Sequence, residues 1–218
     1  MIITEAIEKN KKICLIAYSV SEHIEKKLHK IIEIVLERYN HAKMVPPIYT
    51  CVKELLVNAV KANFKNIYFE DHKPQNAAVQ SIEYTLALKL FKLEMSRENA
   101  GYLEELARKW NIQVKIYLWV ANETFFIKVV NPAEMTAQEM KKVQQKLADA
   151  ASCEDIAEYF LKVDDDSEKE GAGLGLVMIS MMLKSLNLSS TNLAIEAHPH
   201  ETVATLIIPL NVRYSIIE

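Results

Sequence analysis

The chain has 218 residues, half of them hydrophobic, and a formal net charge of −3. This length fits one domain, or one domain with a large insertion, and the hydrophobic share suffices for a full core. The small net charge excludes a sequence-wide attraction to nucleic acid or anionic membranes. Cys14, Cys51 and Cys153 lack metal-like spacing, no apolar run could span a bilayer, and no signal-like region begins the chain. We therefore expect a soluble cytoplasmic protein with reduced thiols.

Apolar periodicity predicts alternating helices and short strands. Two helix starts carry a capping-box pattern, Thr136 with Glu139 and Ser152 with Asp155. The order of elements predicts an α+β fold with helices on one face of a mixed sheet. In chain order we expect a strand at 11–20, a helix at 21–40, a break with two prolines at 41–47, a helix at 48–63, a strand at 65–70, a helical stretch at 77–110 interrupted near Gly101, a hairpin at 114–130, helices at 136–151 and 152–163, an acidic segment at 164–170, a helix at 177–187 and a hairpin at 192–210.

Three of the four glycines, Gly171, Gly173 and Gly175, directly precede the apolar helix at 177–187. Glycine lets a ligand approach the backbone, and a helix start offers unpaired N–H groups and partial positive charge. The cluster is therefore either a phosphate cradle or simply a flexible loop before a helix. It fits the dinucleotide fingerprint poorly, because Leu176 occupies the place of the third glycine, and the lack of G-K-[ST] excludes a P-loop.

Glu54, Asn58 and Lys61 form a thin polar strip on an otherwise apolar helix. Their spacing of i, i+4 and i+7 puts them on one stripe, flanked on both sides by apolar residues. A buried carboxylate and amide need partners, which a cation and phosphates would supply. The alternative is a hydrogen bond between Glu54 and Asn58, with a lysine that reaches the rim.

These segments resemble the GHKL superfamily of ATP-binding domains, which includes gyrase, the heat-shock chaperone and the histidine kinases. KELLVNAVKA resembles the N box, E-x-x-x-N-x-x-K; GAGLGLVMISMMLKSL resembles the G2 box; ETVATLIIPL resembles the closing strand. The similarity covers most of 45–210 without the inserted region, and the front end is similar to that of anti-sigma-factor serine kinases. The resemblance implies a Bergerat-type fold, a two-layer α/β sandwich with a largely antiparallel sheet and a helical insertion.

The resemblance also implies a role for each matching residue. Asn58 would bind Mg²⁺, Glu54 would polarise the attacking water or acceptor hydroxyl, and Lys61 would lie near the phosphates of ATP. The three glycines would donate main-chain N–H groups to the phosphates, and Thr202 would lie next to the adenine. The whole chain, 1–218, would be one histidine kinase-like ATPase domain, with a helical insertion at 74–110 and a mobile ATP lid at 133–170.

The chain departs from the family in its adenine box, D-x-G-x-G. Asn131 replaces the aspartate, Ala133 and Met135 replace the glycines, and Glu201 replaces a usual glycine in the closing strand. An asparagine can still accept a hydrogen bond from the adenine amino group, but without the assistance of a charge. We therefore expect weaker ATP binding than in a family member with the aspartate.

Two regions bear on partners. The insertion carries more apolar residues than one helix face needs, so it either packs internally or offers a surface to a protein partner, including a second copy of the chain. The acidic segment 164–170 is either a solvated part of the lid or, through Asp164, Asp165 and Asp166, a metal site. We expect no nucleic-acid or membrane partner.

None of the six histidines lies in the H-E-x-x-x-P context of a kinase phosphoacceptor. The leading hypothesis is a signalling module that binds ATP and Mg²⁺, as a protein kinase or slow ATPase without its own acceptor histidine. The alternative is a non-catalytic, degenerate GHKL fold that acts as an anti-sigma-like platform for a partner. The third hypothesis is a fragment of a larger kinase whose acceptor histidine lies on another chain.

Overall fold

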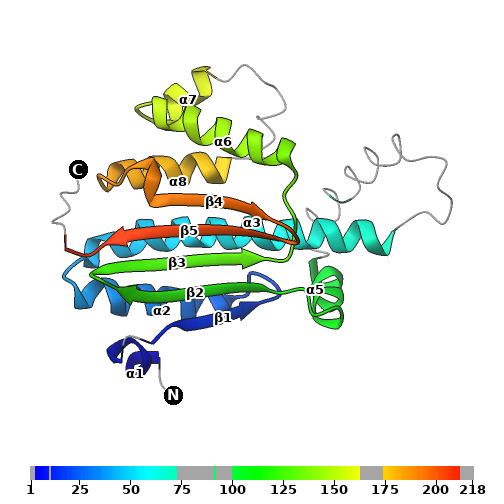
Figure 1. Ribbon diagram of the computed structural model, residues 1–218, viewed down its shortest axis with the longest axis horizontal. Coiled ribbons are helices and arrows are strands. Elements are labelled where there is room, and N and C mark those ends of the chain that lie inside the picture. Colours follow the sequence, from blue (N-terminus) through cyan, green and yellow to red (C-terminus); the bar gives the residue numbers. More distant parts are fainter. Residues whose placement is uncertain (1–2, 10, 73–90, 92–99, 163–173, 212–218) are drawn as a thin grey trace.

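The computed structural model describes residues 3–9, 11–72, 91, 100–162 and 174–211, which form a five-stranded sheet with helices (Figure 1). The strand order is β1-β2-β3-β5-β4, and all four pairings are antiparallel. The predicted hairpins are confirmed as β2 with β3 and β4 with β5. The strands are β1 (Ile13–Ala17), β2 (Val114–Ala121), β3 (Thr124–Asn131), β4 (Leu193–His198) and β5 (Glu201–Pro209).

Alternating side chains give the sheet one buried face. In β2, Val114, Ile116 and Leu118 are buried and the residues between them are half-buried. Phe125 and Ile127 continue the same face in β3. Successive side chains of a strand point to opposite faces, so this alternation fixes the side on which helices must pack.

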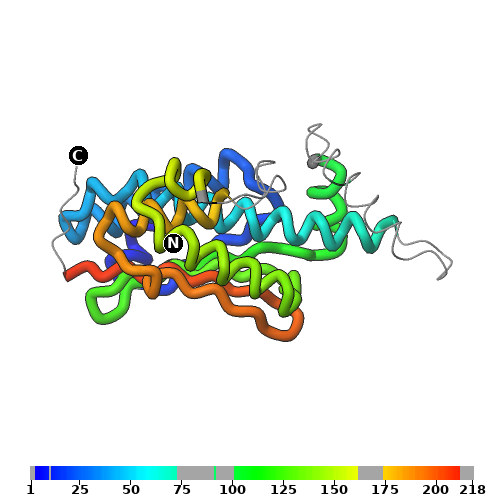
Figure 2. The backbone as a smooth tube through the Cα atoms, turned by 90° about the horizontal axis from the view of Figure 1, so that it is seen from above, coloured from blue at the N-terminus to red at the C-terminus, as the bar shows by residue number. Residues whose placement is uncertain are grey.

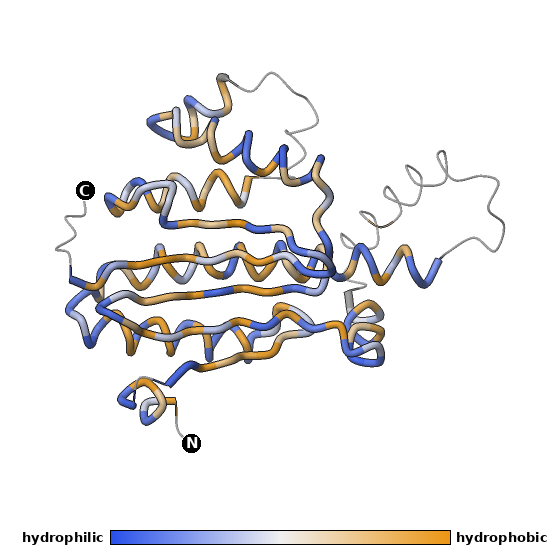
Figure 3. Tube along the Cα trace, in the orientation of Figure 1, coloured by the Kyte–Doolittle hydropathy of each residue, from blue (hydrophilic) through white to orange (hydrophobic). Residues whose placement is uncertain are grey.

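Three helices cover that face: α2 (Glu22–Arg38), α3 (Val45–Asp71) and α8 (Leu174–Ser185) (Figure 2). The helix α3 lies between the other two and contacts β3. Its apolar residues recur at helical spacing, which appears as a regular colour alternation in Figure 3. The predicted two-layer α/β sandwich is confirmed. The other helices are α1 (Ile3–Glu8), η1 (Ala42–Met44), α5 (Ala100–Lys109), α6 (Ala137–Ser152), α7 (Ile156–Lys162) and η2 (Ser190–Asn192).

The strand predicted at 65–70 is wrong, because α3 continues to Asp71. Phe64, Ile67 and Tyr68 are buried and extend the helical stripe of the preceding turns. Tertiary packing therefore determines the secondary structure of this short segment, although its residues favour a strand. The two prolines do not break the chain as predicted but lie in the first turn of α3, where proline is tolerated.

One predicted cap is confirmed and one is wrong. Thr136 and Glu139 form a capping box at the start of α6. Ser152 instead ends α6, and its hydroxyl donates to the carbonyl of Asp149. The side chain of Asp155 accepts from the N–H of Glu158 at the start of α7. The sequence pattern misplaced this helix start by several residues.

The predicted insertion is described only in part. The described part of the insertion includes the helix α5, Ala100–Lys109. Phe91 is buried against Tyr68 of α3, with 5.7 Å between ring centroids. The remaining residues of the predicted helix at 77–99 and the acidic segment 164–170 lie outside the described residues. None of the described helices is long and apolar enough to cross a membrane.

Candidate functional site

The polar strip of α3 borders its buried face. Leu55, Leu56 and Ala59 are buried, whereas Glu54 is half-buried and Asn58 is exposed. These two residues, both described, make no hydrogen bond to each other. The hydrogen bond between Glu54 and Asn58 that the sequence allows as an alternative is therefore absent.

The first turn of α8 packs directly on this strip. A Cβ added at Gly175 would lie 2.5 Å from Oε2 of Glu54 and 3.6 Å from Nδ2 of Asn58. A side chain at this position would make the Glu54 carboxylate, the mobile end of that side chain, turn away, so glycine is what lets the carboxylate lie against α8. The glycine-rich segment and the helix strip, far apart in sequence, thus meet in the fold. Gly171 and Gly173 lie outside the described residues.

A pocket of about 240 Å³ opens beside this junction, between α3 and the sheet. Asn58 lies at its edge, and Asn131 and Thr202 lie on its sheet side. Mostly apolar walls with a few polar groups are typical of small-molecule sites. The main apolar wall residues are Leu55, Ala59, Val129, Leu176, Ile195 and Ala204.

The buried polar residues of the described chain lie on two strands and on the face of α3 near them. They are Asn63, Asn131 and Thr202, with exposed fractions of 3%, 5% and 9%. Asn131 and Thr202 are direct partners across β3 and β5. The hydroxyl of Thr202 donates to the carbonyl of Ala133 at 2.6 Å, and Nδ2 of Asn131 donates to Oδ1 of Asn63 at 3.5 Å. The two residues predicted at the base site are therefore neighbours.

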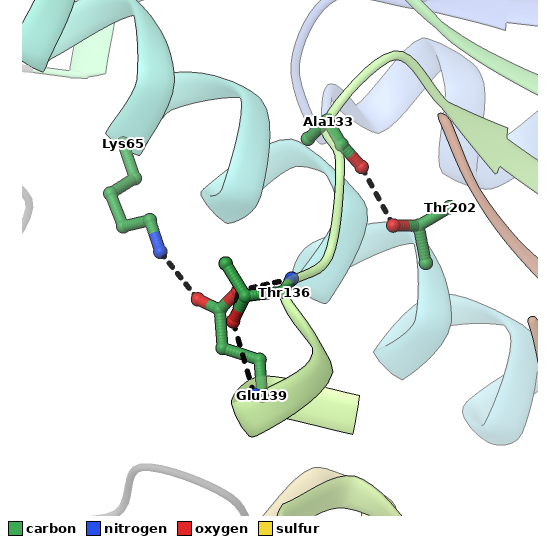
Figure 4. A network of polar contacts seen from close by, with 5 residues as sticks. All are labelled: Lys65, Ala133, Thr136, Glu139 and Thr202. Atoms are coloured by element: carbon green, nitrogen blue, oxygen red, sulfur yellow. Dashed lines mark hydrogen bonds and ion pairs between the residues drawn. The ribbon is translucent and has the colours of Figure 1, made fainter. Parts of the chain in front are cut away.

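An ion pair joins α3 to α6 at the rim of the pocket (Figure 4). Nζ of Lys65 donates to Oε1 of Glu139 at 2.9 Å, and Oε2 of Glu139 accepts from the N–H and hydroxyl of Thr136, each at 2.9 Å. Burial alone would raise the pKa of the Glu139 carboxyl, but the hydrogen bonds from Lys65 and Thr136 outweigh it and lower the pKa below its ordinary value. The rim is thus tied to the start of the predicted lid.

Lys61 is not brought to the pocket. It is exposed on α3, and the lysine of the pocket wall is Lys65, one helical turn further on. No group of three or more His, Cys, Asp or Glu side chains positioned for a metal ion occurs within the described ranges. Asp164–Asp166 lie outside these ranges, so the alternative metal site there stays a prediction.

The sequence patterns do not indicate Lys65 as a pocket residue or Asn63 as the partner of Asn131, and they indicate Glu139 only as a cap. For Asn63 a signal exists, because an amide interrupts the apolar face formed by Val60, Phe64 and Ile67. The predicted strand at 65–70 includes Lys65, and a strand does not bring together the neighbours that Lys65 has in a helix. Its pairing with Glu139 is a tertiary contact that no local pattern predicts.

The chain is similar to an uncharacterized protein of Treponema pallidum (strain Nichols), to which it is 29% identical over 210 residues. The match covers 96% of this chain and 40% of that protein, so the chain spans less than half the length of its relative. No protein-family model matches. No solved structure matches.

Proposed function

We propose that this chain is an ATP- and Mg²⁺-binding signalling module of the GHKL type, a kinase or slow ATPase without its own phosphoacceptor histidine. One observation carries the proposal: Gly175 at the start of α8 faces Glu54 and Asn58 on α3, whose side chains would lie 2.5 Å and 3.6 Å from a Cβ added to it, beside the pocket lined by Asn131 and Thr202. A helix start, an amide side chain, a carboxylate and a pocket with mostly apolar walls then lie side by side. Phosphoryl transfer requires this combination of positioning and electrostatics.

The residues at the junction suit a triphosphate with one cation. The first turn of α8, a helix of 12 residues, has N–H groups without intrahelical partners and partial positive charge, both of which favour phosphate. Asn58 would give its side-chain oxygen to Mg²⁺, which needs few protein ligands when phosphates and water complete its shell. Glu54 would orient the attacking water or hydroxyl, and Gly171 and Gly173 would add N–H donors.

Thermal unfolding tests the proposal. With nucleotide at about a hundredfold excess over Kd, ATP with Mg²⁺ should stabilise the protein by about 2.7 kcal/mol, which raises Tm by about 5–10 °C for a chain of this size. Asn58→Ala should lose the Mg²⁺-dependent part of the shift, whereas Asn58→Asp, which keeps an oxygen ligand, should retain it. No shift at millimolar nucleotide, or an unchanged Asn58→Ala, would contradict the assignment.

The second candidate function is a partner-binding platform without catalysis. It is favoured by the neutral Asn131 and by Glu134, a carboxylate on the pocket wall that repels phosphate, whereas the charge of Glu139 is balanced by Lys65. In this case the protein keeps the fold, and neither ATP nor ADP shifts its Tm with or without Mg²⁺. The thermal measurement therefore separates the two functions.

A protein partner fits either function. In the predicted lid, α7 exposes Ile156, Phe160 and Leu161, with exposed fractions of 41%, 48% and 88%. Such apolar side chains in a cluster mark interaction surfaces. The lid or the insertion would contact this partner, which could be a second copy of the chain.

A cytoplasmic location remains part of the proposal. All three cysteines are free thiols, as expected in a reducing compartment. Cys51 is fully buried on α3, and burial raises the pKa of its thiol to about 12. Its role is therefore packing rather than redox chemistry.

A further inference from the structure

Asn63 is an unusual residue for its position. It is 3% exposed and lies on the apolar face of α3 with Val60, Phe64 and Ile67. A buried amide costs free energy unless its groups are hydrogen-bonded, and a leucine would fill this face without that cost. The amide therefore requires an explanation beyond packing.

The hydrogen-bond partner of Asn63, Asn131, supplies this explanation. Oδ1 of Asn63 accepts from Nδ2 of Asn131 at 3.5 Å, and Asn131 lines the pocket whereas Asn63 lies behind it. An asparagine amide is planar, with its NH₂ and its carbonyl oxygen at opposite corners. When the NH₂ is directed to Asn63, the carbonyl oxygen is the group left for the pocket.

Thr202 is restricted in the same way. Its hydroxyl has one proton, which it donates to the carbonyl of Ala133 at 2.6 Å. Toward the pocket its oxygen can then only accept a hydrogen bond. Asn131 and Thr202, adjacent across β3 and β5, thus offer two acceptors side by side.

We infer that Asn63 is a positioning residue that sets the orientation of the Asn131 amide and thereby the base preference of the pocket. This inference rests on the proposed nucleotide site. A base with an exocyclic amino group, such as adenine, brings donors to the two acceptors. A base with a keto group at that position, such as hypoxanthine, brings an acceptor against them and leaves buried groups unpaired.

Competition between ATP and inosine triphosphate, which differ in this group, tests the inference. With Mg²⁺ present, wild-type protein should bind ATP at least about tenfold more tightly than inosine triphosphate. Asn63→Leu removes the acceptor, so the Asn131 amide can turn and the ratio should fall to about threefold or less. Asn63→Asp keeps an acceptor at the same place and should keep the wild-type ratio.

The outcomes separate this inference from the proposed function. Equal binding of both nucleotides, or a wild-type ratio in Asn63→Leu, leaves the nucleotide site intact and overturns the role of Asn63. Binding of neither nucleotide to the wild type overturns both. If Asn63→Leu does not fold, as judged by melting without ligand, the wild type and Asn63→Asp still decide the matter, because either one failing to prefer ATP contradicts the inference.

Discussion

At the scale of single residues, two features define the candidate site: Gly175 has no side chain, and Asn131 has no charge. Gly175 allows α8 to contact Glu54 without a clash. Asn131 takes the place where the GHKL resemblance expects an aspartate, so the pocket has an acceptor without a formal charge. Each feature can be altered by a single substitution with a defined control.

Gly175→Ala should weaken the ATP-dependent stabilisation more than it changes the ligand-free protein. The new Cβ would lie 2.5 Å from Oε2 of Glu54, so the carboxylate, which is the mobile end of its side chain, must turn away from α8. We expect the Tm of the ligand-free protein to change little and the ATP-dependent shift to decrease, because Glu54 leaves its position at the junction. The matched control is Gly101→Ala in α5, where the added Cβ meets no side chain within 4 Å. Its ATP-dependent shift should equal that of the wild type, and a similar loss in both variants would contradict the argument.

Asn131→Asp should strengthen ATP binding. A charge-assisted hydrogen bond is about twice as strong as a neutral one, so Kd should fall by about five- to tenfold. The ligand-free protein should melt at a lower temperature, because the carboxylate is buried. Calorimetric titration measures the first effect, and Asn66→Asp, which adds a charge at an exposed wall position, is the control. Equal gains in both variants would argue against a base contact at 131.

At the scale of elements, the Lys65–Glu139 pair joins α3 to α6 and so fixes where the predicted lid begins. The same glutamate completes the capping box of α6. One carboxylate thus supports both the helix start and the contact between helices. The side chains are partly exposed, at 29% for Lys65 and 43% for Glu139, so salt screens the pair.

The stability from this pair should depend on pH. The pKa of Glu139 in the fold lies below its ordinary value of 4.5, so the stabilisation is present above that pH and is lost as pH falls through the lowered pKa. The Tm difference between wild type and Glu139→Gln should therefore be constant above about pH 5 and shrink toward pH 3. Lys65→Met should give a difference with the same trend. A difference that grows in acid would contradict the assignment.

At the scale of the whole molecule, the sequence predicts the layers well and the contacts between them poorly. Alternation in β2 and β3 and the apolar stripe of α2 identify those elements and their buried faces. The resemblance of two distant segments to the N box and G2 box predicts that they meet, and a Cβ added to Gly175 would lie 3.6 Å from Nδ2 of Asn58. Lys61, matched to the same box, is exposed and is not among the residues that line the pocket.

The errors share a physical cause. Residues 65–70 have strand-like composition, but burial of Ile67 and Tyr68 against the rest of the protein keeps them helical. Asn63 and the Lys65–Glu139 pair are defined by partners that are distant in sequence, which no local period can indicate. Local propensity decides an element only where tertiary packing does not oppose it.

Amide hydrogen exchange with and without ATP and Mg²⁺ tests whether the start of α8 and the strip of α3 bind nucleotide together, because it locates the ligand on the chain. We expect added protection in two separate segments, the first turn of α8 at 174–178 and the strip of α3 at 52–62, while β1 and α2 do not change. Asn58→Ala should lose the Mg²⁺-dependent part in both segments together. Nucleotide binding detected by calorimetry, with added protection in only one of these two segments or in neither, would contradict this expectation.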